Sequence, residues 1–155
     1  MRAVVQRVSR AAVRAGGETV GAIGPGLCVL LSVAPSDDDA TAVHLADRVA
    51  GLRIFPDEHG KMNLDLAAAG GAVLVVSQFT LHADTARGHR PSFIGAGPHE
   101  LAGRLCDAFG AALRARGHTV ATGRFGAHME VDLCNDGPVT LVLTGGEGPW
   151  PADAG

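Results

Sequence analysis

The chain has 155 residues, of which 46% are hydrophobic and 19% are charged, a balance that is typical of one globular domain and that excludes a disordered or fibrous chain. Thirteen basic against sixteen acidic residues give a net charge of −3, which argues against tight, sequence-independent nucleic-acid binding, so no DNA partner is expected. Five Phe, one Trp and no Tyr are too few for an aromatic stacking platform.

Strand signals dominate the first half of the chain. Short apolar–polar alternations cover residues 2–23, and two consecutive glycines interrupt them, so a long β-hairpin is predicted. Residues 27–33 are an apolar run of strand length that only Ser32 interrupts. Two further strands are predicted at 52–55, which a proline ends, and at 72–76, the most apolar of all.

Two helices are predicted from their end signals. Pro35 and residues 36–39 (Ser-Asp-Asp-Asp) supply an N-cap and negative charge for a helix that ends near Gly51. The second helix has Pro98 in its first turn and Gly117 just past its end. The stripes expected to pack on a sheet are Val43, Ala46, Val49 and Ala50 in the first helix and Leu101, Leu105, Phe109 and Leu113 in the second.

The end of the chain returns to strand patterns. Strands are predicted at 129–134 and 139–143, and residues 145–155 form a Gly- and Pro-rich tail that we expect to be flexible. Strands outnumber helices and do not alternate regularly with them. The pattern therefore favours a single α+β domain over residues 1–144, with helices on one side of a sheet or barrel, rather than a doubly wound fold.

The cysteines and the N-terminus indicate the compartment. Cys28, Cys106 and Cys134 are odd in number and far apart, so a disulfide framework is not expected and a reducing compartment fits. The N-terminus has no apolar signal core, and no stretch approaches ~18 apolar residues. We therefore expect a cytoplasmic protein without a membrane partner.

Motifs for metals and nucleotides do not occur in this sequence. The cysteines form no close pair, there is no His-Glu-x-x-His, and no Gly-x-Gly-x-x-Gly leads from a strand into a helix. The sequence therefore predicts neither a metal site nor a nucleotide-phosphate site.

The first candidate site follows the strand at 72–76. Ser77, Gln78, Phe79 and Thr80 place hydroxyl, amide and aromatic groups where a buried strand reaches the edge of a sheet. The alternative is a plain strand end whose hydroxyl side chains cap the next turn.

A serine or threonine nucleophile is a weaker interpretation of the same segment. It would join Ser77 or Thr80 to His82 and Asp84, but residues so close in sequence seldom form a triad. The nucleophile elbow Gly-x-Ser-x-Gly is also absent from the sequence.

The second candidate site is the segment 135–140. It is either a hairpin turn followed by an edge strand or a rigid polar edge that reads the shape of a ligand. The bond between Gly137 and Pro138 can be cis, since an X-Pro bond adopts this form at a cost of only about 0.5–1 kcal/mol. A cis bond would turn both carbonyl oxygens in a shared direction.

Six blocks of this sequence, in this order, resemble the D-aminoacyl-tRNA deacylases. They are residues 1–9 (MRAVVQRVS), 52–55 (LRIF), 60–63 (GKMN), 75–81 (VVSQFTL), 90–93 (RPSF) and 135–140 (NDGPVT). The resemblance covers residues 1 to about 143. It implies a homodimeric α+β protein, with antiparallel-rich sheets in a barrel-like core and two main helices, that hydrolyses the ester joining a D-amino acid, or glycine, to the 3′ end of tRNA. It implies no metal and no organic cofactor.

The resemblance also assigns the catalytic residues. Ser77, Gln78, Phe79 and Thr80 would line the pocket for the aminoacylated terminal adenosine. Two mechanisms fit the family: Thr80 as nucleophile, or water positioned by main-chain N–H groups near residues 78–80 and by the 2′-hydroxyl of the RNA. We favour the second, because an aminoacyl ester is already activated and needs chiefly positioning and oxyanion stabilisation.

Chiral selectivity is assigned to Gly137 and Pro138 of the partner subunit, and we expect the bond between them to be cis. This pair would close the pocket and place the site at the dimer interface. An enzyme that accepts many D side chains and spares L-aminoacyl-tRNA must read the substituents of Cα. The two carbonyl groups would accept the α-amino group and clash with an L side chain. Glycine would be accepted because it has no side chain.

The sequence departs from the family pattern at His82, His128 and Glu130, all outside the two motifs. Two other functions remain open. One is a small cytoplasmic serine or threonine esterase that uses Ser77 or Thr80 with a distant histidine. The other is a non-catalytic dimeric RNA-binding module.

Overall fold

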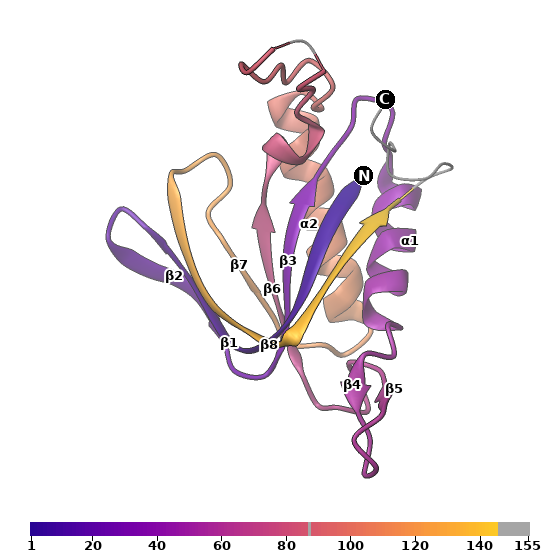
Figure 1. Cartoon of the computed structure of the whole chain (residues 1–155). Coiled ribbons are helices and arrows are strands. Elements are labelled where there is room, and N and C mark those ends of the chain that lie inside the picture. The colour runs from indigo at the N-terminus through magenta and orange to yellow at the C-terminus, as the bar shows by residue number, and fades with distance from the viewer. Residues whose placement is uncertain (87, 146–155) are drawn as a thin grey trace.

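One large sheet carries two helices on one of its faces (Figure 1). This computed structural model describes residues 1–86 and 88–145. Its elements are β1 (Arg2–Ala15), β2 (Glu18–Ile23), β3 (Gly26–Ser32), α1 (Asp39–Ala50), β4 (Phe55–Pro56), β5 (Met62–Leu64), β6 (Ala72–Ser77), the 3₁₀ turn η1 (Phe79–His82), α2 (His99–Ala115), β7 (Val120–Thr122) and β8 (Met129–Thr144).

The large sheet is mixed. Its strand order is β2-β1-β3-β6-β7, and β8 also pairs with β1. β1 is antiparallel to β2, β3 and β8, whereas β3 with β6 and β6 with β7 are parallel. The parallel pairs arise because α1 and α2 cross over between these strands and return the chain in the same direction. The predicted α+β class with two helices is confirmed, but the sheet is less antiparallel than expected.

The sheet curves until its two ends nearly meet. A Cβ atom added to Gly21 of β2 would lie 2.6 Å from the carbonyl oxygen of Thr122 in β7, so the backbones of the two strands are almost in contact. The predicted N-terminal hairpin is confirmed, and Gly16 and Gly17 form its turn with φ of 61° and 82°, values that glycine adopts readily. The core is therefore barrel-like, as expected.

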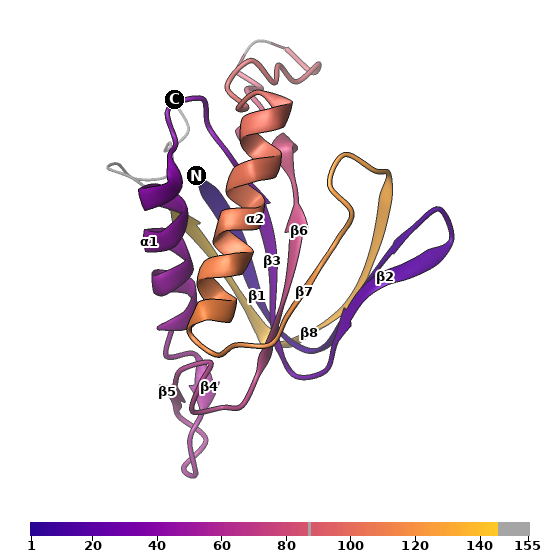
Figure 2. The same cartoon turned by 180° about the vertical axis from the view of Figure 1, so that it is seen from behind.

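Helices α1 and α2 lie side by side over one face of the sheet, as Figure 2 shows from behind. The main core lies between them and the sheet, and in α2 it includes the predicted Leu105, Phe109 and Leu113. In α1 the prediction for Val43 was wrong, because this side chain is 40% exposed and the buried face includes Leu45 instead. A second cluster on the opposite face of the sheet contains Val8, Ala11, Val13, Ile23, Cys28, Leu74 and Val76.

Other expectations need smaller corrections. The strand predicted at 52–55 is only β4, which pairs with β5 in a separate two-stranded sheet. β7 was not predicted. Pro98 is the N-cap of α2 rather than part of its first turn. Within the described ranges, 1–86 and 88–145, no helix is long and apolar enough to cross a membrane. Most of the predicted tail, 146–155, lies outside the described residues.

The C-terminal strand corrects the hairpin interpretation of residues 135–138. β8 runs without reversal from Met129 to Thr144, and both of its halves pair with β1. Gln6 pairs with Thr140 and Val8 with Asn135, so Arg7 alone faces the four residues 136–139. These residues therefore bulge out of the strand instead of turning the chain. Pro138 has no N–H group for a sheet ladder, which fits this interruption of the pairing.

Candidate functional site

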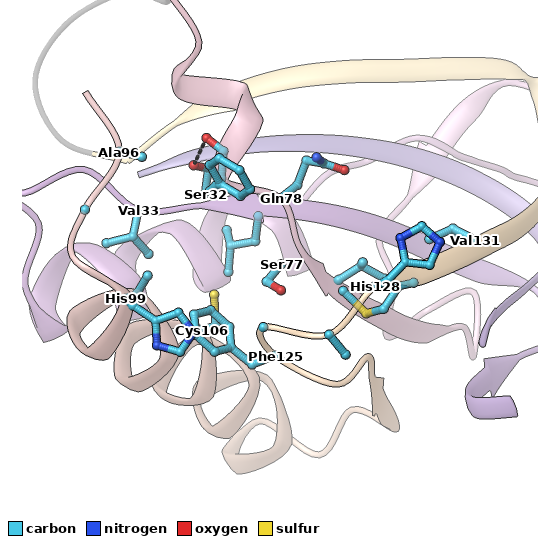
Figure 3. A pocket seen from close by; sticks show the side chains of 18 residues that line it. Ser32, Val33, Ser77, Gln78, Ala96, His99, Cys106, Phe125, His128 and Val131 are labelled. Atoms are coloured by element: carbon cyan, nitrogen blue, oxygen red, sulfur yellow. Dashed lines mark hydrogen bonds between the residues drawn. The ribbon is translucent and has the colours of Figure 1, made fainter. Parts of the chain in front are cut away.

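A cavity of about 510 Å³ opens where the parallel strands β3 and β6 end (Figure 3). Its walls also include the start of α2 and the loop between β7 and β8. The carboxyl ends of parallel strands are a usual place for a ligand, and the volume is in the range of small-molecule sites, roughly 300–1,000 Å³. This cavity is the candidate active site.

The first predicted motif lies in the wall of this cavity. Ser77, Gln78 and Phe79 line it, and the Ser77 hydroxyl faces its interior (Figure 3). Thr80 is exposed and is not among the lining residues; its hydroxyl oxygen accepts a hydrogen bond from the Gln78 side-chain amide. The structure thus brings three of the four residues to the cavity and holds the fourth at its margin.

The main chain of this motif leaves two N–H groups at the start of η1 available to a substrate. The N–H of Gln78 donates to the carbonyl oxygen of Leu31 at 2.7 Å, so it is not available to a substrate. The N–H of Leu81 donates to the Gln78 carbonyl at 3.2 Å and is the first amide bonded within the turn. Of the main-chain N–H groups that were expected to act as donors near residues 78–80, those of Phe79 and Thr80 therefore remain available.

An aromatic pair stands beside the motif. The Phe79 side chain is 57% exposed and packs edge-to-face on Phe93, with ring centroids 5.1 Å apart. Phe93 belongs to the loop that leads to α2. Because Phe79 also lines the cavity, the pair presents apolar surface next to a site whose inner wall contains hydroxyl and amide groups.

The opposite wall was missed by sequence reasoning. His99 and Phe125 pack edge-to-face with ring centroids 4.7 Å apart, and His128 lies further along the same cavity (Figure 3). Gly126 is required here, because its φ is +74° and a Cβ atom would lie 2.9 Å from Nε2 of His99. The sequence signal was an aromatic residue and a histidine among glycines in a short loop between two strands.

Cys106 also lines the cavity, but it is unsuited to nucleophilic chemistry. Burial, with a smaller contribution from Asp107, raises the pKa of its thiol to about 11. At neutral pH the side chain is therefore a protonated thiol, whereas the thiolate is the reactive form.

The triad-like arrangement weighed from the sequence does not form. Nδ1 of His82 lies 2.6 Å from Oγ of Ser32, a residue that sequence analysis did not single out. Asp84 bonds through its main chain to Ser92, and its carboxylate accepts the N–H of Ala86. His82 and Asp84 are therefore engaged away from Ser77 and Thr80.

The second predicted motif is held rigidly on the surface. The peptide bond between Gly137 and Pro138 is cis. Nε of Arg7 donates to the carbonyl of Asp136 at 3.1 Å, and the N–H of Val139 donates to Oδ1 of Asn135 at 3.0 Å. Gly137 and Pro138 are exposed and do not line the cavity of their own chain. In one chain the two motifs thus remain separate.

Within residues 1–86 and 88–145 no group of three or more His, Cys, Asp or Glu side chains could hold a metal ion. The side chains that line the cavity offer hydroxyl, amide and imidazole groups beside apolar and aromatic surface. Such an arrangement can bind a nucleoside-sized ligand and offer hydrogen-bond donors to an ester carbonyl.

The fold and this site define a class: α+β proteins whose ligand cavity lies at the ends of parallel strands in a nearly closed mixed sheet. Comparison with known proteins specifies the family. Residues 4–144 match the model of the family described as D-Tyr-tRNA(Tyr) deacylase. The chain belongs to this family of D-aminoacyl-tRNA deacylases.

Curated relatives match over nearly their whole length. A D-aminoacyl-tRNA deacylase of Chloroflexus aurantiacus is 57% identical over 155 residues, which are 100% of this chain and 97% of the relative. One of Symbiobacterium thermophilum is 59% identical over 143 residues, 92% of this chain and 95% of the relative.

Two solved structures share the fold. The c-Myc DNA Unwinding Element Binding Protein is 41% identical, with a TM-score of 0.87 over 96% of this chain and 99% of the other. A probable eukaryotic D-amino acid tRNA deacylase is 17% identical, with a TM-score of 0.79 over 92% of this chain and 97% of the other, and it supports the fold alone.

Proposed function

We propose that this chain hydrolyses the ester bond of D-aminoacyl-tRNA and of glycyl-tRNA, releasing the free amino acid and the tRNA. The observation that carries the proposal is the placement of Ser77, Gln78 and Phe79 in the wall of the cavity, in a chain that belongs to the D-aminoacyl-tRNA deacylases. The activity is a chiral proofreading step in translation. We place it in the cytoplasm, where aminoacyl-tRNA is used.

In this proposal, catalysis depends on the positions of the attacking water and of the hydrogen-bond donors. Water attacks the ester carbonyl carbon, the bond from this carbon to the ribose 3′-oxygen breaks, and the 3′-oxygen leaves with a proton. The N–H groups of Phe79 and Thr80 stabilise the developing oxyanion, and the 2′-hydroxyl of the terminal adenosine orients the water. Thr80 acts through its hydrogen bond with Gln78 rather than as a nucleophile.

Selectivity requires a second subunit. We assign the reading of Cα to Gly137 and Pro138 of the partner subunit, which lie over the cavity and accept the α-amino group. The exposed position of this bulge, outside the cavity of its own chain, supports the assignment.

The surface of β8 supports a homodimer. Among the described strands β8 pairs only with β1, so its other edge is open for pairing. Val131 and Val142 on this strand are 37% and 48% exposed. An open edge with apolar side chains is a typical surface for association with a second copy. We assign the deacylase domain to residues 1–144.

A deacylation assay tests this function. D-Tyr-tRNA and Gly-tRNA are expected to be hydrolysed, L-Tyr-tRNA to be spared, and a chelator to leave the rates unchanged. Ala102 and Ala108 are both half-buried in α2, but only Ala102 lines the cavity. Ala102→Leu should lower kcat/KM at least about 10-fold by filling the site, whereas Ala108→Leu should not. Equal hydrolysis of D- and L-Tyr-tRNA, or equal effects of the two variants, would contradict the proposal.

A further inference from the structure

Ser32, which lines the cavity, and His82, which does not, form a buried polar pair. Their exposed fractions are 2% and 8%, and in the part of the chain that the structure describes they are the only polar residues buried to this degree. Oγ of Ser32 and Nδ1 of His82 are 2.6 Å apart. Ser32 is the last residue of β3, and His82 is the last residue of η1. The pair therefore joins the sheet to the turn that carries the site.

The same hydroxyl also reaches the first residue of the turn. Oγ of Ser32 lies 3.4 Å from the carbonyl oxygen of Phe79. If Nδ1 of His82 carries the ring proton, it donates to Ser32, and the hydroxyl in turn donates to Phe79. One chain of hydrogen bonds then spans η1 from its end to its start. The turn is further held by Arg2, whose Nη1 donates to the Leu81 carbonyl at 2.7 Å.

The pair is uncharged at neutral pH. Burial, with smaller contributions from the Arg2 guanidinium and the N-terminal ammonium, lowers the pKa of His82 to about 4, and the opposing effect of Asp37 is weaker. A neutral imidazole suits a structural hydrogen bond, whereas a base with so low an affinity for protons is unsuited to activate a serine for attack. The chemistry therefore points away from a Ser32–His82 catalytic dyad.

We propose that Ser32 and His82 are positioning residues: their hydrogen bond fixes the Phe79–His82 turn so that the N–H groups of Phe79 and Thr80 face the ester. This inference rests on the proposed function. Neither side chain takes part in the chemistry, and the effect is transmitted through the Phe79 carbonyl and the end of the turn. Loss of the hydrogen bond should thus impair turnover more than binding.

The test compares four variants in single-substrate kinetics on D-Tyr-tRNA. Ser32→Ala and His82→Leu remove the hydrogen bond, whereas His82→Asn keeps a polar atom near the position of Nδ1. Cys28→Ala is the matched control, because Cys28 is buried on the same strand β3 but belongs to the cluster on the opposite face of the sheet. Circular dichroism monitors folding throughout.

Ser32→Ala and His82→Leu are expected to lower kcat about 10-fold or more with KM within about twofold, and His82→Asn and Cys28→Ala are expected to stay close to wild type. Wild-type kcat in His82→Leu, an equal loss in Cys28→Ala, or no rescue by His82→Asn would overturn the proposal. A tyrosyl adduct on Ser32 in mass spectra would overturn it too. If Ser32→Ala does not fold, the two His82 variants decide. An inactive wild-type protein would refute the proposed function instead.

Discussion

Lowering the pH should reduce the free energy of unfolding, because His82 is buried as a neutral imidazole. In the unfolded chain a histidine titrates near pH 6.5, whereas burial beside Arg2 lowers the pKa of His82 in the folded protein to about 4. Between these two pH values the unfolded chain binds more protons than the folded chain. The free energy of unfolding therefore falls as the pH falls through this window, and the contribution of His82 is fully present above pH 6.5.

The size of the effect follows from the two pKa values. From pH 7 to pH 4.5 the linkage amounts to about 2 kcal/mol, a substantial part of the 5–15 kcal/mol that stabilises a typical domain. Carboxylates also titrate in this range, so the wild-type curve alone does not isolate the histidine. His82→Asn does, because asparagine does not titrate and its amide can still bond to Ser32.

The assay is urea unfolding at pH 7.0, 5.5 and 4.5, followed by far-UV circular dichroism. The wild type should lose about 2 kcal/mol more than His82→Asn between the first and the last pH. The matched control is His59→Asn, since His59 lies in the exposed turn between β4 and β5. A difference between wild type and His82→Asn that changes by less than about 0.5 kcal/mol over this range would refute the reasoning.

Three further predictions concern activity and tRNA binding. Thr80→Ala should keep kcat within about 10-fold of wild type, whereas a D-Tyr-tRNA that ends in 2′-deoxyadenosine should react at least about 100-fold more slowly, because the 2′-hydroxyl and not Thr80 orients the water. Gly137→Ala should lower kcat/KM or the preference for D over L substrates, since the new Cβ would lie 2.8 Å from Cγ2 of Val139; the control Gly16→Ala, at a position with nothing within 4 Å, should leave both unchanged. Affinity for tRNA should fall only modestly with salt, with a slope well below that of ~8 neutralised phosphates, because the net charge is −3 and Arg7 is engaged with Asp136 and Ile54 of its own chain.

Each of these predictions has a result that would contradict it. Loss of turnover in Thr80→Ala together with normal rates on the deoxy substrate would restore Thr80 as the nucleophile. Equal effects of the two glycine substitutions would show that the bulge is not special. A steep dependence of binding on salt would indicate a wide phosphate contact instead of one local to the 3′ end.

Local patterns predicted most of the fold, because they are set by neighbours in sequence. The glycine turn of the hairpin, the N-cap at Asp38 and the apolar stripe of α2 each depend on a few adjacent residues, and all are present. β7 was missed because it has only three residues and is a strand through its pairing with β6. The bulge at 136–139 could not be distinguished from a hairpin turn, because Gly-Pro interrupts a strand in either case.

The same difference between local patterns and long-range contacts applies to the site. Ser77 ends the buried strand β6, and Gln78 and Phe79 follow it directly, so the sequence predicted them as site residues. His99 and Phe125 come from separate segments that only tertiary packing brings together. The bond between Ser32 and His82 spans 50 residues, and no spacing rule connects them. Long-range partners of this kind require the fold.

A crystal structure with D-tyrosyl-3′-aminoadenosine, in which an amide replaces the scissile ester, tests the central claim most directly. The account predicts that the analogue lies in the cavity against Ser77, Gln78 and Phe79, with its carbonyl oxygen toward the N–H groups of Phe79 and Thr80. Gly137 and Pro138 of the partner subunit should then contact the α-amino group. An analogue bound elsewhere, or bound here in a monomer without any contact from a second chain, would contradict it.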